Sequence, residues 1–297
     1  MTFSIYLPWL CSVVLAAAAP VIVRRLAPRA AVWSLVTAAA ACAAGTTWSL
    51  VLMAATLLGR TAEVEAAARA RGVDLAEPVP RLLAGGAALL IGLAVWRLAQ
   101  VIATRTAVRT ELRRLCEGHG AELVIVDLEL AHAFAVPGPE PHIVATRSML
   151  KALTAAERRV LLEHERAHLR FGHHRFEAAV AVAVAVNPLL APVRNAVAFL
   201  LERWADETAA SEVGSRRLAL RSLARAAQAA TATSRSGVRL AFAELGVIHR
   251  LEALRVSPPR AARIPALAAA LLCLVVGLAT ADATWDFVGL VSWLVPF

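Results

Sequence analysis

The chain has 297 residues, of which 59% are hydrophobic and 18% are charged, with a mean hydropathy of +0.63. This composition excludes an ordinary soluble globular protein and predicts an integral membrane protein. The net charge of +9 comes from arginines that flank apolar runs and do not form one patch with aromatic residues, so we expect no direct binding of nucleic acid.

Residues 1–104 are expected to form three transmembrane helices. The first span, residues 4–23, has no basic residue before it and several arginines after it, which favours an uncleaved anchor over a signal peptide. The second lies within residues 31–58, and the third covers about residues 82–103. Residues 60–81 carry mixed charge and are expected to form a short external loop or helix.

The positions of the arginines predict the orientation of these spans in the cell membrane. Basic residues accumulate on the cytoplasmic side of membrane proteins. The flanking arginines are Arg24, Arg25 and Arg29 after the first span, and Arg105, Arg109, Arg113 and Arg114 after the third. The N-terminus is therefore predicted outside and residues 105–263 inside, in contact with the bilayer.

A small β-sheet is expected at the start of this cytoplasmic part. Residues 122–127 and 142–146 have the β-branched composition of strands, and the proline-rich residues between them, 133–141, are expected to form a turn. An edge of such a sheet can bind an extended peptide by strand addition, although a purely supporting role fits the sequence equally well.

The next stretch, from Thr154 to Arg170, predicts a helix that carries a metal motif. Thr154 and Glu157 form the sequence pattern of a capping box. His164 and His168 lie four residues apart on one helix face, with Glu165 beside them. This H-E-x-x-H pattern is the signature of zinc peptidases, whereas two ordinary histidines on an exposed face are the structural alternative.

The residues after the motif predict the end of the motif helix, a hairpin and a further helix. Gly172 is expected to end the helix, and the adjacent His173 and His174 are expected to face solvent or lipid headgroups. Residues 176–200 include an uncharged stretch broken by prolines, which fits a membrane-associated hairpin better than a complete crossing. A helix over about residues 190–212 then carries Glu202, Asp206 and Glu207.

The remaining chain reads as helices. Residues 213–256 are expected to form two arginine-rich amphipathic helices broken near residues 234–237. Residues 264–281 are an uncharged run that predicts a last span, and residues 282–297 are expected to be a short external tail at the membrane interface.

The motif suggests a specific chemistry. Catalytic zinc uses three protein ligands and keeps one position open. His164 and His168 provide two ligands, and Glu165 is the expected general base, which takes a proton from the attacking water. His249 and nearby arginines are candidates for stabilising the transition state, and the sequence does not choose among them.

The chain resembles the BlaR/MecR-type integral-membrane zinc metallopeptidases, a gluzincin family. The resemblance covers residues 1–282 and is strongest over 133–210. Its motifs are Ala133-Phe-Ala-Val-Pro-Gly138, Ile143-Val-Ala-Thr146, Leu150 to His168, the Asn187-Pro188 break, Glu202-x-x-x-Asp206 and the Pro258-Pro259-Arg260 before the last span. It implies that Glu202 is the third zinc ligand and that Asp206 orients a ligating histidine, with Glu207 as the competing ligand.

The resemblance also implies a fold and a partner. We expect a mainly α, multi-pass membrane protein with an embedded gluzincin-like zinc metallopeptidase domain of α-helices and a small β-sheet. Its substrate is expected to be a cytosolic protein such as a BlaI-type transcriptional repressor in a signal-transduction pathway. Only about 15 residues follow Ala281, so the penicillin-binding sensor domain of the antibiotic receptors is missing from this sequence.

Two other functions are compatible with the sequence. One is a membrane metallopeptidase of the HtpX/CAAX-protease type, which acts in quality control or protein processing. The other is a non-catalytic membrane transducer whose metal site is structural. A structural zinc site normally has a fourth protein ligand, which the motif lacks.

Overall fold

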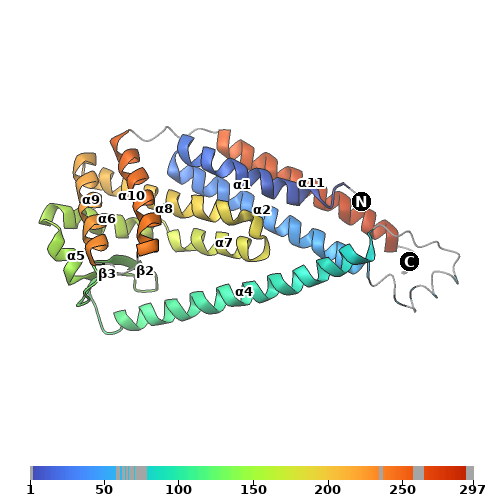
Figure 1. The fold of residues 1–297 in the computed structure, drawn as a ribbon, viewed down its shortest axis with the longest axis horizontal. Coiled ribbons are helices and arrows are strands. Elements are labelled where there is room, and N and C mark those ends of the chain that lie inside the picture. Colours follow the sequence, from blue (N-terminus) through green and yellow to red (C-terminus); the bar gives the residue numbers. More distant parts are fainter. Residues whose placement is uncertain are drawn as a thin grey trace.

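The computed structural model describes residues 3–57, 79–233, 237–256 and 264–291, together with residues 61, 64, 66 and 70. A bundle of long helices forms one end of the molecule, and shorter helices with a small sheet form the other (Figure 1). Most of the predicted external segment 60–81, and the Pro258-Pro259-Arg260 motif, lie outside the described residues.

Within the described residues, four helices are long and apolar enough to cross a membrane. They are α1 (Leu7–Arg25), α2 (Pro28–Ala55), α4 (Arg81–Cys116) and α11 (Ile264–Val291). The expected class, a mainly α multi-pass membrane protein with a small sheet, is confirmed.

Two of these helices differ from their predicted extents. The predicted boundary at residue 104 falls inside α4, which continues to Cys116 and runs along the molecule from the bundle to the sheet (Figure 1). Likewise, α11 continues to Val291, so most of the predicted external tail is helix. In both cases nothing in the sequence breaks the helix, because no proline or glycine pair follows the apolar run.

Helix α2 is the centre of the bundle. It consists largely of alanine and other small residues, and it packs against α1, α4, α7, α8 and α11. Small residues allow helices in a membrane to approach closely. At Gly45 the approach is so close that a β-carbon would lie 2.5 Å from a γ-carbon of Val276 in α11.

A helical hairpin inserts beside α2. Helix α7 (His173–Val186) enters the bundle, the 3-10 turn η2 (Pro188–Leu190) reverses the chain, and α8 (Ala191–Glu212) returns. Asn187 at the reversal is completely buried, and its amide nitrogen donates to the hydroxyls of Ser12 (2.8 Å) and Thr46 (3.3 Å). Its Oδ1 accepts from the backbone N–H of Leu189. The hairpin is therefore anchored to α1 and α2 by hydrogen bonds, and it brings the far end of α8 back beside α6.

The sheet has three strands in the order β1-β3-β2. β1 (Leu123–Val126) is parallel to β3 (His142–Thr146), and β2 (Ala133–Val136) is antiparallel to it. The prediction of a turn over residues 133–141 is wrong in its first part, because Ala133–Val136 pairs along β3. Only residues 137–141, which include three prolines, form the connection.

Shorter helices lie with the sheet at this end of the molecule (Figure 1). They are α5 (Arg147–Ala152), α6 (Ala155–Arg170), α9 (Arg216–Thr233) and α10 (Gly237–Arg255). Two of them, α5 and α6, contact the sheet. Helix α6 contacts β2 on one side and α8 and α9 on others. The motif helix thus lies between the sheet and the returning arm of the hairpin.

Candidate metal centre

Helix α6 has well-defined ends. The Thr154 hydroxyl accepts from the backbone N–H of Glu157, and the Glu157 carboxylate accepts from the backbone N–H of Thr154, which confirms the predicted capping box. Gly172 has φ of +62°, a left-handed conformation that terminates the helix, as predicted. These two ends define the limits of the motif helix, Ala155–Arg170.

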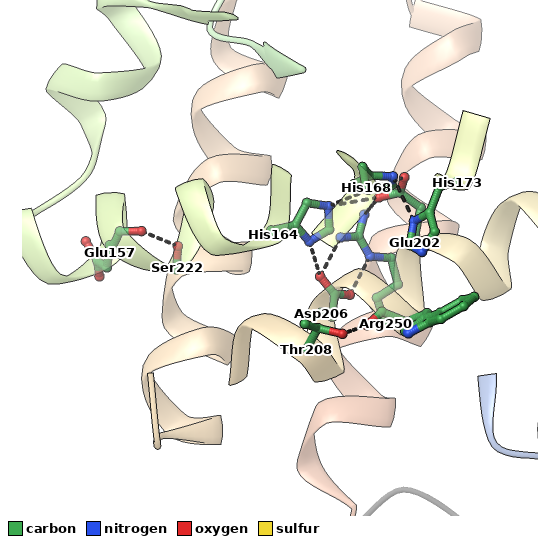
Figure 2. A network of polar contacts seen from close by, with 10 residues as sticks. Glu157, His164, His168, His173, Glu202, Asp206, Thr208, Ser222 and Arg250 are labelled. Carbon is green, nitrogen blue, oxygen red and sulfur yellow. Dashed lines mark hydrogen bonds and ion pairs between the residues drawn. The ribbon is translucent and has the colours of Figure 1, made fainter. Parts of the chain in front are cut away.

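The structure brings His164, His168 and Glu202 together. Ligand atoms of the three residues lie within 4.8 Å of one another, and Figure 2 shows both imidazoles facing the carboxylate from α8. The Nε2 atoms of the two histidines are 3.2 Å apart, and each is 3.5 Å from an oxygen of Glu202. Two residues of one helix and one residue from a helix about forty positions later thus form one cluster.

These distances fit a zinc ion. Zinc bonds to histidine nitrogen and carboxylate oxygen are about 2.0–2.2 Å long, so the edges of a tetrahedron around zinc are about 3.3–3.5 Å. The two Nε2 atoms are 3.2 Å apart, and each lies 3.5 Å from a different oxygen of the Glu202 carboxylate, Oε2 for His164 and Oε1 for His168. Three donors at this spacing leave one position of the tetrahedron for water or substrate, the arrangement of a catalytic zinc site.

Asp206, one turn after Glu202, contacts the other nitrogen of His164. Its Oδ1 accepts from Nδ1 at 3.0 Å, which leaves Nε2 available for a metal. Burial alone would lower the pKa of His164, but the hydrogen bonds and charges of Asp206 and Glu202 outweigh it and raise this pKa to about 10. The buried carboxylate of Asp206 and the partly exposed carboxylate of Glu202 thus stabilise positive charge at the position of the histidines.

Arg250 of α10 supplies a positive charge that the sequence did not single out from the other arginines. Its guanidinium binds both oxygens of Asp206 at 2.7 Å and one oxygen of Glu202 at 2.8 Å. The side chain is 14% exposed, and the carboxylates overcome its desolvation and raise its pKa. The arginine orients both carboxylates toward α6 (Figure 2).

His173 is the second residue that sequence reasoning missed. It was expected to face solvent or headgroups, but it is 1% exposed and packs against Trp204. Its Nδ1 lies 3.0 Å from Nδ1 of His168. His173 thus orients the His168 ring and leaves Nε2 available for a metal, as Asp206 does for His164. His173 is the first residue of α7, directly after the left-handed Gly172, and its ring lies against the rings of His168 and Trp204. His174, by contrast, is only partly buried and lies outside the cluster.

Glu165 lies beside the cluster and next to the sheet. It is 7% exposed, and burial, reinforced by the negative charge of Glu202, raises the pKa of this carboxyl to about 7. A hydrogen bond with the backbone of Ala135 acts in the opposite direction and connects Glu165 to β2. A carboxyl that titrates near neutrality can both accept and return a proton.

The free edge of β2 faces this carboxyl. The carbonyl of His132 accepts from the backbone N–H of Thr146 in β3, so alternate residues of β2 point toward β3. Ala133 and Ala135 therefore direct their backbone groups away from β3, to the side on which Glu165 lies.

Two alternatives from the sequence lie away from the cluster. The Glu207 carboxylate binds Arg216, which also donates to backbone carbonyls near the end of α10. His249 is exposed and contacts the ring of Phe199, on a different side of α10 from Arg250. Of the residues considered for a third ligand, Glu202 is the one placed beside both histidines.

Comparison with known protein families agrees with this geometry. A model described as peptidase family M48 matches residues 108–270, more than half of the chain, and this range contains every residue of the cluster. The chain belongs to peptidase family M48. No curated protein and no solved structure matches it in the same comparisons.

The M48 assignment makes this chain a metallopeptidase, and its four apolar helices make it a membrane protein. The match supports an M48 peptidase and does not support the BlaR/MecR type in particular. It is compatible with the HtpX-like alternative.

Proposed function

We propose that this M48 peptidase is a membrane-embedded, zinc-dependent metalloendopeptidase that hydrolyses peptide bonds of a protein substrate on the cytoplasmic side. The observation that carries the proposal is the cluster of His164, His168 and Glu202, in which the two Nε2 atoms are 3.2 Å apart and each lies 3.5 Å from one of the two carboxylate oxygens. A zinc ion held there would polarise the scissile carbonyl and acidify a water molecule.

The chain's own residues would then handle the proton and the substrate. Glu165 accepts a proton from the attacking water and returns it to the departing amine, for which a pKa of about 7 is well suited. The backbone groups of Ala133 and the carbonyl of Ala135 pair with an extended substrate, and the Ala135 N–H binds Glu165, so that the scissile bond lies beside this carboxylate. Arg250 keeps Glu202 and Asp206 in place and offsets their charge.

The cytoplasmic orientation is supported by the arginines. The turn between α1 and α2, which carries Arg24, Arg25 and Arg29, lies at the end of the bundle next to the peptidase helices (Figure 1). Near this turn, the backbone carbonyl of Val23 accepts a hydrogen bond from Arg203 of α8. Arg203 directly follows Glu202, the proposed third ligand. The position of this turn, together with the positive-inside rule, supports a cytoplasmic metal site.

Helix α7 supports the same arrangement. Its 14 residues span about 21 Å, which is short of the roughly 30 Å of a bilayer core. The hairpin of α7 and α8 would dip into the membrane and return, which keeps Glu202 on the same side as His164.

Two substrate classes follow from the two resemblances. Cleavage of a BlaI-type repressor follows from the likeness to BlaR/MecR-type proteins. Quality control or processing of membrane-associated proteins, as in HtpX-type peptidases, has the M48 match in its favour. Comparing the proteomes of cells that carry the wild-type protein or Glu165→Gln identifies the class, because uncleaved substrates accumulate in the variant.

The enzymatic role is tested with purified full-length protein in detergent. Glu165→Gln is expected to retain zinc and to lose proteolysis of a generic unfolded protein by at least a hundredfold, since the general base alone contributes about this factor. Glu163→Gln is the matched control, because that carboxylate lies on the same helix and binds Arg166. Zinc retained with unchanged proteolysis in Glu165→Gln would show that the metal site is structural.

A further inference from the structure

A basic groove lies next to the metal centre, between the end of α4, the loop from β2 to β3, and the junction of α6 with α7. Its volume is about 820 Å³. Five arginines and one histidine line it, against one glutamate, Glu122; the basic residues are Arg109, Arg113, Arg166, Arg170, His174 and Arg175.

Three of these arginines carry positive charge that the protein does not neutralise. Arg166 is bound by Glu122 at 2.8 and 2.9 Å, and Arg170 by Glu212 at 3.1 Å. In contrast, no carboxylate among the described residues pairs with Arg109, Arg113 or Arg175.

His174, which also lines the groove, is affected by the positive charge of these arginines. Burial lowers the pKa of His174, and the positive charges of Arg109 and Arg175 lower it further. The groove therefore has an uncompensated positive charge and is suited to an anionic ligand.

The groove continues the path of a bound substrate. Ala135 contacts Glu165, and the residues that follow β2, from Pro137 to Pro139, form one wall of the groove. Leu169, one turn after Glu165 on α6, forms part of another wall. A chain paired with β2 enters the groove about two residues, or roughly 7 Å, from the scissile bond.

We propose that the basic groove selects substrates with acidic side chains on one side of the scissile bond, beginning about two residues from it. The inference rests on the proposed peptidase function and adds the substrate class. Arg109, Arg113 and Arg175 are the specificity-determining residues, because their charge is free to pair with carboxylates of the substrate.

The test uses full-length protein in nanodiscs of zwitterionic lipid and three fluorogenic peptides with one cleavable bond. One peptide is neutral, one has three glutamates on the N-terminal side of the bond, and one has them on the C-terminal side. At low salt, three exposed ion pairs are expected to raise kcat/KM for one of the acidic peptides about tenfold above that for the neutral peptide. The other acidic peptide is expected to be cleaved no better than the neutral one.

The triple variant Arg109→Gln, Arg113→Gln, Arg175→Gln is expected to lose this preference while it cleaves the neutral peptide at the wild-type rate. Arg221→Gln is the control, because Arg221 is an exposed arginine on α9 that does not line the groove. It is expected to keep the preference.

Each outcome has a clear meaning. Equal cleavage of all three peptides by the wild type, or an unchanged preference in the triple variant, overturns the proposal for the groove. Failure of the wild type to cleave any peptide overturns the proposed function instead. Unchanged preference together with weaker binding of the triple variant to anionic phospholipid vesicles assigns the groove to lipid headgroups and also overturns the proposal.

Discussion

The substitution Asp206→Asn tests the link between α10, α8 and the motif histidines. Asn keeps the shape of the side chain but removes its charge. In the wild type the carboxylate makes three contacts, two with Arg250 at 2.7 Å and one with Nδ1 of His164 at 3.0 Å. Because Asp206 is 6% exposed, water cannot replace these contacts in the folded protein.

The magnitude follows from what each contact does. Loss of the partner that orients a ligating histidine weakens metal binding by about 10- to 100-fold. Loss of one member of a buried ion pair costs about 3–5 kcal/mol. Since Arg250 retains Glu202 as a partner at 2.8 Å, we expect the lower end of that range, about 3 kcal/mol. Arg250 would also hold Glu202 more tightly and so compete with the metal.

The assay is zinc competition against a chelator of known affinity, with purified full-length protein at pH 8, followed by thermal unfolding with and without zinc. The control is Glu207→Gln, which makes the same change of charge one residue away, where the carboxylate binds Arg216. The control is expected to stay within about threefold of the wild type. Zinc affinity of Asp206→Asn within twofold of the wild type would refute the assigned role of Asp206.

Three further predictions concern the surroundings of the site. His173→Phe removes the nitrogen that contacts His168 and is expected to weaken zinc binding about tenfold. His173→Asp is expected to restore part of this loss, because its carboxylate offers an acceptor to His168. The same chelator competition measures both variants, and equal zinc affinities of the two variants would contradict the assigned role of His173. The backbone hydrogen bond from Thr154 holds the pKa of Glu157 below 4.5, so its stabilisation is complete above pH 4.5 and is lost as the pH falls. Glu157→Gln should therefore lower the unfolding free energy by about 1 kcal/mol at pH 7 and by much less near pH 3, as denaturant titration would show, while a difference independent of pH would argue against it. Asn187→Ala should lower the unfolding free energy by about 1–2 kcal/mol through loss of the hydrogen bonds that anchor the hairpin, and an unchanged thermal midpoint would contradict this.

Features that depend on neighbouring residues could be read from the sequence. The limits of α6 follow from its capping box and from Gly172, and the spans follow from apolar runs of sufficient length. The reversal at Asn187-Pro188 follows from the prolines. Each of these signals lies within a few residues of the structure that it specifies.

Features that depend on contacts between distant segments of the chain could be predicted only in part from the sequence. Ala133–Val136 is too short and too rich in alanine to be recognised as a strand, and it becomes one because β3 supplies its hydrogen bonds. The same applies to Arg250, one of 30 arginines in the chain, which is distinguished only by the side of α10 that faces α8.

The sequence by itself determined the membrane spans, the motif helix and the chemical nature of the ligands, because residue type and helical spacing are local properties. Tertiary structure decided which of the downstream carboxylates reaches the motif. The hairpin returns α8 so that Glu202 and Asp206 face His164 while Glu207, one residue further on, binds Arg216. It also decided that His173 is buried against His168 and Trp204, because α7 starts directly after the left-handed Gly172 and packs into the bundle beside α8. The candidate metal centre is thus built from a local motif and from contacts between helices that only the packed bundle creates.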